Sequence, residues 1–173
     1  MKYTEEAYAN MINACKNIAS EFMQPLAAKR ALLDPVNNID DIDLFEVSED
    51  EIRELFNKFC DVMGLECELG FFRDNDEENG RYSEHTDAVV LPLCIGCYGG
   101  KKIVEHMTHE LFHAFQYAAI CNPKDYPCFD EATIKQWDYE FKHYISGAKD
   151  MKGYKEQEIE KSAWEFGKLI AGV

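Results

Sequence analysis

Residues 103–116 read IVEHMTHELFHAFQ, and this stretch decides the fold that the sequence predicts. Its apolar side chains recur at the spacing of an α-helix and continue just beyond it, at Val104, Met107, Leu111, Phe112, Phe115 and Ala119. A stripe this wide predicts a substantially buried helix over residues 101–120. His109 and His113 are four residues apart, so they project side by side from that helix.

The segment His-Glu-Leu-Phe-His at 109–113 matches the HExxH pattern. Two imidazoles one helical turn apart can bind one tetrahedral Zn²⁺ ion. Glu110 lies slightly further round the helix, where its carboxylate can take a proton from a water molecule on the zinc and pass it to a leaving amine. The alternative is a pair of polar residues that face solvent. Buried histidines need partners, so the apolar surroundings favour zinc.

A catalytic zinc site also needs a third protein ligand and one open position. The metzincin pattern is excluded, because residues 114–119 stand where a glycine and a third histidine would follow. His143 is the one histidine further along the chain, and it lies in a different helical pattern. The segment YKEQEIEKSAWEFG at 154–167 holds the candidate glutamates for a ligand from a later helix.

HELFH at 109–113 and the E-x-x-A sequence Glu160-Lys161-Ser162-Ala163 together resemble the gluzincin metallopeptidases, particularly the small ones found in bacteria and phages. The resemblance covers roughly residues 86–167 and leaves out the first 65 residues. It implies a zincin-like fold, Zn²⁺ as the cofactor and peptide-bond hydrolysis.

The resemblance also implies a ligand set of His109, His113 and Glu160. Ser162 stands where many gluzincins carry a second glutamate. Glu156 and Glu158 stay open as alternatives to Glu160 within the same segment. The competing interpretation of the segment is an acidic face of a terminal helix exposed to solvent.

Gluzincins often stabilise the oxyanion with a Tyr or His that precedes the ligand helix, which implies Tyr154 first and His143 second. His106 shares a face with the motif and is either a surface histidine or a group that contacts a ligand histidine or the substrate. Asp130 and Glu131 are candidates for orienting a metal-bound histidine through its second ring nitrogen.

The rest of the sequence predicts an α+β fold with a small mixed sheet packed against the HExxH helix. We expect one domain over 1–173, with a helical N-terminal portion at 1–65 and a catalytic core at 66–173. A capping box at Ser48-Glu49-Asp50-Glu51 and a closing Gly64 bound the second helix. Further helices are predicted at 4–31 with a break or kink at Pro25, at 131–145 and at 156–170, strands at 67–73 and 86–93, a turn at 34–38 and loops at 74–80 and 122–129.

Pro92 lies in the second predicted strand, Thr86 to Leu93, and indicates that this strand runs at a sheet edge. An edge strand just before the HExxH helix can pair with an extended peptide. We therefore expect a peptide or protein substrate to dock along Thr86 to Leu93.

The net charge of −15 argues against nucleic acid and anionic membrane surfaces as partners, because both require a basic surface. Two acidic clusters, at 40–54 and 74–78, are interpreted as solvated faces and loops. The sequence contains no signal peptide or transmembrane segment, which predicts a cytoplasmic protein. Nothing in it indicates an oligomeric state.

Cys94 and Cys97 form a CxxC pair between a predicted strand and a predicted helix. A thioredoxin-like dithiol occurs in such a setting, but a βαβ pattern is lacking. A structural zinc site with Cys121 and Cys128 is a second alternative. The favoured interpretation is a pair of thiols in a turn at the rim of the active site.

These observations predict a zinc-dependent metallopeptidase in which Glu110 is the general base. The alternative is a catalytically idle zincin-like domain that binds or regulates a partner. Retention of Glu110 favours the enzyme, because a binding domain has no need of a base.

Overall fold

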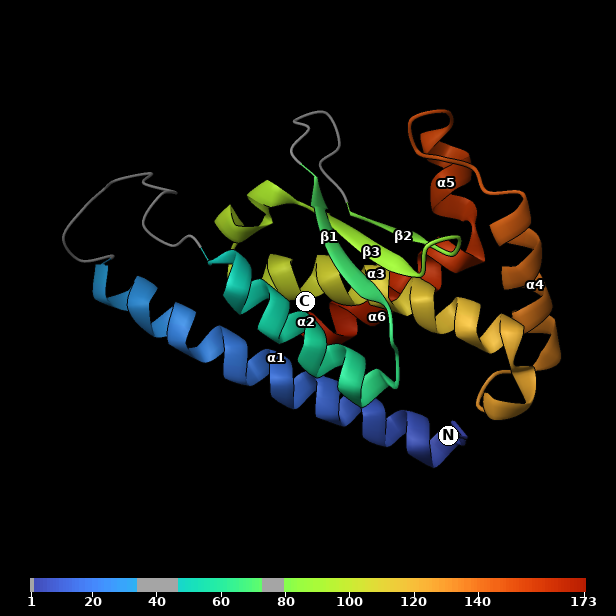
Figure 1. Cartoon of the computed structure of the whole chain (residues 1–173), viewed down its shortest axis with the longest axis horizontal. Coiled ribbons are helices and arrows are strands. Elements are labelled where there is room, and N and C mark those ends of the chain that lie inside the picture. The colour runs from blue at the N-terminus through green and yellow to red at the C-terminus, as the bar shows by residue number, and fades with distance from the viewer. Residues whose placement is uncertain (1, 34–46, 73–79) are drawn as a thin grey trace.

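The computed structural model describes residues 2–33, 47–72 and 80–173 (Figure 1). The predicted turn at 34–38, residues 40–46 of the first acidic cluster and the whole of the second cluster lie outside these residues. The elements in chain order are α1 (Glu5–Leu33), α2 (Glu49–Met63), β1 (Glu68–Phe72), β2 (Arg81–Ser83), β3 (Ala88–Pro92), η2 (Leu93–Cys97), α3 (Gly100–Cys121), η3 (Pro123–Asp125), α4 (Glu131–Lys142), α5 (Met151–Glu156) and α6 (Glu158–Ala171).

The fold is α+β and rich in helix, with a small mixed sheet, as the sequence predicts. The strand order is β1-β3-β2, with β3 parallel to β1 and antiparallel to β2. The expectation that residues 86–93 form an edge strand is therefore wrong. Pro92 is the last residue of β3, where its missing N–H affects only the end of the ladder. The unpredicted strand β2 covers the other side of β3.

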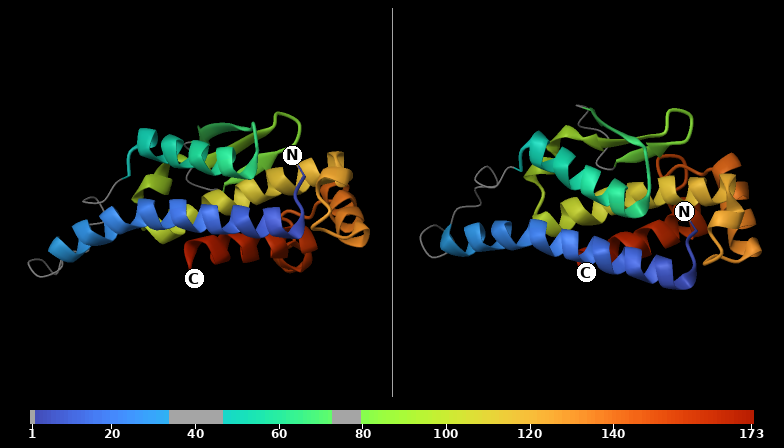
Figure 2. Two further views of the ribbon diagram at one scale, coloured as in Figure 1. Left: turned by 90° about the horizontal axis from the view of Figure 1, so that it is seen from below. Right: turned by 60° about the horizontal axis from the view of Figure 1, so that its bottom comes forward.

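Helix α3 is the centre of the molecule and packs against β2, β3 and helices α1, α2, α4 and α6 (Figures 1 and 2). Its apolar face is fully buried, as Met107, Leu111 and Phe115 illustrate. The predicted burial of this helix is confirmed. One buried apolar cluster joins side chains from the first two helices to those of α3 and α6.

Helix α2 begins and ends where local signals predict. The Ser48 hydroxyl accepts from the Glu51 N–H, and the Glu51 carboxylate accepts from the Ser48 N–H at 2.9 Å. Gly64 adopts φ 63°, the left-handed conformation that ends helices and that only glycine adopts without strain.

Two predicted helix boundaries need correction, and helix α1 does not break at Pro25. Helix α1 continues through Pro25, which is exposed, so water can hydrate the carbonyl that loses its helical partner. Helix α4 ends at Lys142 rather than at residue 145. The predicted helix at 156–170 divides at Gln157, which has extended backbone angles between α5 and α6.

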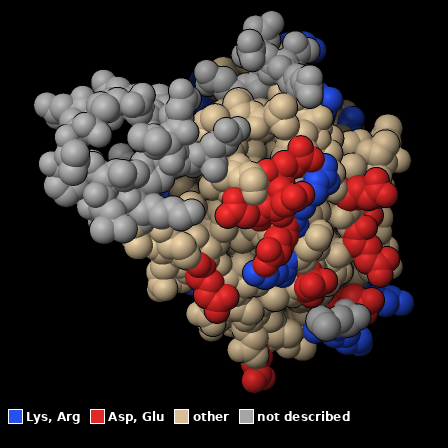
Figure 3. Space-filling view, turned by 60° about the vertical axis from the view of Figure 1, so that its left-hand side comes forward, with Lys and Arg blue, Asp and Glu red and all other residues tan. Residues whose placement is uncertain are grey.

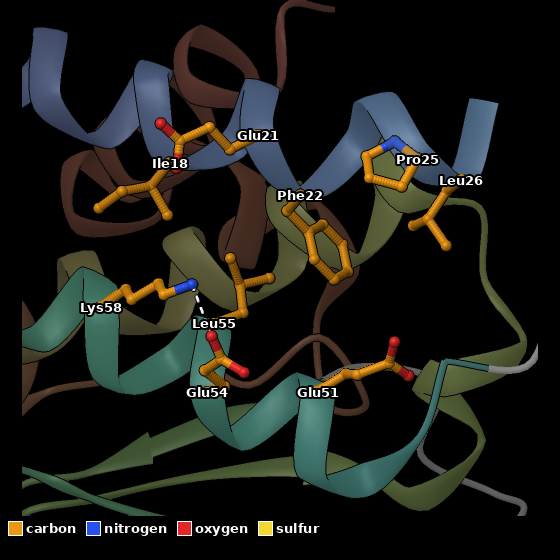
Figure 4. A pocket seen from close by; sticks show the side chains of 9 residues that line it. All are labelled: Ile18, Glu21, Phe22, Pro25, Leu26, Glu51, Glu54, Leu55 and Lys58. Atoms are coloured by element: carbon orange, nitrogen blue, oxygen red, sulfur yellow. Dashed lines mark ion pairs between the residues drawn. The ribbon is translucent and has the colours of Figure 1, made fainter. Parts of the chain in front are cut away.

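Helices α1 and α2 face each other across a groove with an apolar floor and an acidic rim (Figure 4). Lys58 on the rim pairs with Glu54 at 2.7 Å. The lining residues are Ile18, Glu21, Phe22, Pro25, Leu26, Glu51, Glu54, Leu55 and Lys58. Acidic side chains also gather on the face shown in Figure 3, in keeping with the net charge of −15.

Among the described residues, no helix is both long enough and apolar enough to cross a membrane.

Candidate metal site

Helices α3 and α6 bring His109, His113 and Glu160 together in the interior. Their ligand atoms all lie within 4.8 Å of one another, and the residues are 3%, 7% and 1% exposed. In residues 2–33, 47–72 and 80–173 this is the one group of metal-ligating side chains that converges in this way. Glu160 lies in the first turn of α6, and α6 packs along α3, so the carboxylate faces the two histidines.

The donor atoms lie close enough together to bind one metal ion. The Nε2 atoms of His109 and His113 are 3.2 Å apart, and each lies 3.5 Å from an oxygen of Glu160. The Oε2 atom of Glu160 is buried and has no hydrogen-bond partner among the described residues. A buried, unpaired carboxylate oxygen is costly, and a cation between these atoms removes that cost. The group fits a metal ion.

The charges within the cluster are strongly coupled. Burial, followed by repulsion from His113, lowers the pKa of His109 well below its ordinary value. Burial opposes the ionised form of Glu160, but the two neighbouring histidines outweigh it and lower the pKa to about 2. Burial also opposes the protonated form of His113, yet the contact with Glu160 raises its pKa. Glu160 is therefore ionised, as a metal ligand must be.

Glu110 lies beside the three ligand residues rather than among them. Its Oε1 atom is 3.9 Å from Nε2 of His109, and its side chain is buried. Burial raises its pKa to about 7, partly offset by His113 and by the backbone N–H of Tyr82, which donates to the carboxylate. Strand β2 passes close to Glu110, since a Cβ atom at Gly80 would lie 3.1 Å from its Cγ.

Gln116 contacts the second ring nitrogen of one histidine of this group, a role that was predicted for Asp130 or Glu131. The Gln116 Oε1 atom lies 2.8 Å from Nδ1 of His113, and its Nε2 donates to Ser162 Oγ at 2.8 Å. Gln116 is fully buried. Its position three residues after His113, on the same helix face, was a sequence signal that could have found it.

Asp130 and Glu131 serve the start of α4 instead. The Asp130 carboxylate accepts from the Thr133 N–H at 2.7 Å, and Glu131 pairs with Lys135. Both acidic residues are exposed, so neither orients a buried histidine.

The Tyr144 hydroxyl contacts the cluster, which no sequence pattern indicated. It donates to Glu160 Oε1 at 2.6 Å. Burial, together with the Glu160 carboxylate, raises its pKa and keeps it protonated. Tyr154, predicted as the oxyanion group, also hydrogen-bonds the Glu160 carboxylate, and burial together with this carboxylate raises the pKa of Tyr154. Two phenols therefore border Glu160.

Trp164 completes one wall of the site. Its ring lies 4.1 Å from that of His109, centroid to centroid, and its indole N–H donates to Tyr154. His106 packs edge-on against Trp164 at 5.5 Å and is buried, so the surface interpretation of His106 is wrong. Burial, with Lys102, lowers the pKa of His106.

The other candidate ligands lie elsewhere. His143 stacks on Tyr139 at 4.2 Å and bonds its backbone carbonyl. Glu156 pairs with a lysine on the surface, and so does Glu158. Glu160 is thus the glutamate of this segment that meets the histidines.

The cysteines form no comparable cluster within the described part of the chain. Cys94 and Cys97 are exposed in η2, after the central strand, and Cys94 Sγ lies 3.8 Å from the Tyr98 hydroxyl. They do not meet Cys121 and Cys128 in a metal-ligating group. The sheet differs from that of a thioredoxin fold, since the described part of the chain between β1 and β3 contains the antiparallel strand β2.

Comparison of the chain with protein-family models, with curated proteins and with solved structures gives no match.

Proposed function

We propose that this chain is a zinc-dependent metallopeptidase of gluzincin type with a zincin-like fold. The observation that carries the proposal is the buried convergence of His109, His113 and Glu160 beside a second carboxylate, Glu110. A ligand set of two imidazole nitrogens and one carboxylate oxygen suits zinc and leaves a coordination position open. When bound, zinc supplies a Lewis acid that polarises a carbonyl group and lowers the pKa of water to about 7.

Glu110 is the general base in this proposal. It is buried but not a ligand, and burial brings its pKa to about 7, close to the pH at which it must both accept and release a proton. The carboxylate takes a proton from the attacking water and delivers it to the leaving amine. The N–H of Tyr82 fixes one orientation of the carboxylate for both transfers.

Tyr144 is the residue that stabilises the oxyanion. Its hydroxyl keeps its proton, lies against Glu160 and comes from a loop residue that is half exposed, so the ring borders both the cluster and solvent. A phenol in this place can turn its donor from Glu160 to the oxygen of a tetrahedral adduct. Tyr154 supports the same wall through Trp164.

Strand β2 is the docking strand for the substrate. It lies at the end of the sheet order and next to Glu110, so an extended peptide paired along it would cross the metal site. This replaces the expected pairing along β3, which has neighbours on both sides. Peptides methylated at alternate backbone nitrogens test the pairing. Equal inhibition of cleavage by methylated and unmethylated peptides would count against it.

Metal content and peptide cleavage test the proposal together. Native mass spectrometry of the reconstituted wild type should show about one zinc per chain. Glu160→Gln, which keeps the size of the side chain, should lose most of it. Glu110→Gln should keep the zinc and lose cleavage of a mixed peptide library. Absence of zinc from the wild type after reconstitution would overturn the proposal.

The second candidate function is a zincin-like domain that binds a partner without hydrolysis. The half-exposed position of the Tyr144 loop beside the cluster suits a binding face as well as an active site. The same experiment distinguishes the two functions. Zinc in the wild type, with no cleavage of any peptide in the library, would favour the binding domain.

A further inference from the structure

The start of α6 is held by a side chain from another helix. Gln157 is at the N-cap position but does not cap α6 with its own side chain. The Glu140 carboxylate of α4 accepts from the N–H groups of Glu158 at 3.1 Å and Ile159 at 2.8 Å. These N–H groups have no partner inside the helix, and a carboxylate there also complements the helix dipole. Gln136 donates to the same carboxylate at 2.8 Å.

Glu140 thereby leaves the Gln157 side chain available for a different contact. The Oε1 atom of Gln157 accepts from the Ile145 N–H at 2.8 Å, and its Nε2 donates to the Ile145 carbonyl at 3.0 Å. One amide thus satisfies both backbone groups of a single residue. Gln157 is 5% exposed, so water does not compete for these bonds.

Ile145 directly follows Tyr144, so the Gln157 amide fixes the backbone on which the Tyr144 ring is carried. Tyr144 is 50% exposed and lies in the connection between α4 and α5, where its ring meets that of Tyr154 edge-on at 6.4 Å, centroid to centroid. Its hydroxyl lies 2.6 Å from Glu160, which is three residues after Gln157 on the adjoining helix. Residues 157–160 therefore position both the acceptor, Glu160, and, through the contact of Gln157 with Ile145, the donor Tyr144.

We infer that Gln157 is a positioning residue, which holds Tyr144 against Glu160 by clamping the backbone of Ile145. The consequence for catalysis rests on the proposed function, whereas the positioning itself is a property of the metal-free protein. Glu140 is a second positioning residue, because its carboxylate holds the N-terminal end of α6, which directly follows Gln157.

The first test uses metal-free protein with ¹³C in the tyrosine rings. The Tyr144 resonance is identified by its loss in Tyr144→Phe. In Gln157→Ala it should move toward the position of a solvated tyrosine, and the Ile145 amide should exchange faster with solvent. Gln24→Ala is the matched control, since that exposed amide donates to Ser20 of its own helix. An unmoved Tyr144 resonance in folded Gln157→Ala would overturn the inference.

Gln157→Glu is a second variant in case the alanine variant does not fold. It keeps an acceptor for the Ile145 N–H and loses the donor to the Ile145 carbonyl. We expect a Tyr144 resonance between those of the wild type and the solvated tyrosine, with faster exchange at Ile145. A wild-type resonance and wild-type exchange in Gln157→Glu would contradict a two-bond clamp.

The second test is a double-mutant cycle on kcat. Tyr144→Phe should lower kcat by about 10²-fold or more, the usual loss for one oxyanion donor. Gln157→Ala should lower kcat in the same direction, and the double variant should lose no more than Tyr144→Phe alone. Losses that multiply in full would show that the two residues act separately and would overturn the inference. A wild type without cleavage would overturn the proposed function, while the ring resonance still decides the role of Gln157.

Discussion

Gly167 of α6 faces the backbone carbonyl of Glu105 in α3 so closely that a Cβ atom at Gly167 would lie 2.6 Å from that oxygen. The same atom would lie 3.5 Å from Cβ of His109. The two helices therefore approach backbone to backbone beside His109. Gly167 is two helical turns after Glu160 on α6, so this contact sets how near the carboxylate comes to the histidines.

Gly167→Ala should destabilise the protein in spite of its better helix propensity. Alanine gains up to about 1 kcal/mol over glycine in a helix, but overpacking a close contact costs typically 1–3 kcal/mol. A backbone carbonyl cannot turn away from the new methyl group, so we expect the clash to prevail. Denaturant unfolding measures the result. Gly99→Ala is the matched control, because a Cβ there meets nothing within 4 Å. Higher stability of Gly167→Ala would contradict the close approach.

Removal of the metal should lower the thermal midpoint. A ligand present at 100 times its Kd stabilises the folded state by about 2.7 kcal/mol, which for a chain of this size corresponds to a midpoint shift of roughly 5–10 °C. Differential scanning calorimetry with and without zinc measures the shift. Glu110→Gln should retain it and Glu160→Gln should lose it. Magnesium should have no such effect, since it prefers an all-oxygen ligand set. A zinc shift that persists in Glu160→Gln would place the metal elsewhere.

Gln116→Leu should weaken zinc binding by about 10- to 100-fold, as other losses of a histidine-orienting group do. The variant keeps the volume of the buried side chain but leaves Nδ1 of His113 without its partner. Competition with a chromophoric chelator measures the affinity. Gln24→Leu is the control on an exposed helix face. Wild-type affinity in Gln116→Leu would mean that Gln116 is needed only for packing.

Tyr144, Tyr154 and His143 should differ in their effect on peptide cleavage. Tyr144→Phe should lower kcat by about 10²- to 10³-fold with little change in KM, because the lost donor acts mainly in the transition state. Tyr154→Phe should have a smaller effect, and His143→Ala should have almost none, since His143 contacts Tyr139 instead. Steady-state kinetics of the three variants measure the order. A larger loss in His143→Ala than in Tyr144→Phe would reverse the assignment.

The features that follow from local chemistry could be predicted from the sequence. Ser48 and Gly64 bound α2 through bonds to near neighbours, and the spacing of His109 and His113 alone places both on one helix face. The approach of Glu160 to the two histidines was predicted from the resemblance to gluzincins, because periodicity does not show which distant segments meet.

The features that depend on contacts between distant segments could not be predicted from the sequence. Strand β2 has only three residues, too few for an alternating pattern, and it exists through its pairing with β3. Without β2, the proline at the end of β3 indicated a sheet edge. Tyr144 faces Glu160 because of a loop conformation held by Gln157, and no spacing in the sequence encodes that contact.

The ligand set joins two points that lie far apart along the chain, at His113 on α3 and Glu160 on α6. An ion held by both would act as a cross-link that closes the intervening segment, with α4 and α5, into a ring. Such a tie exists only in the folded protein, where the three ligand residues converge, so the ion stabilises the folded state and not the unfolded chain. Because α6 contributes Ile159, Phe166 and Ile170 to the apolar core, loss of the ion would weaken the docking of the C-terminal helix and the packing of that core together.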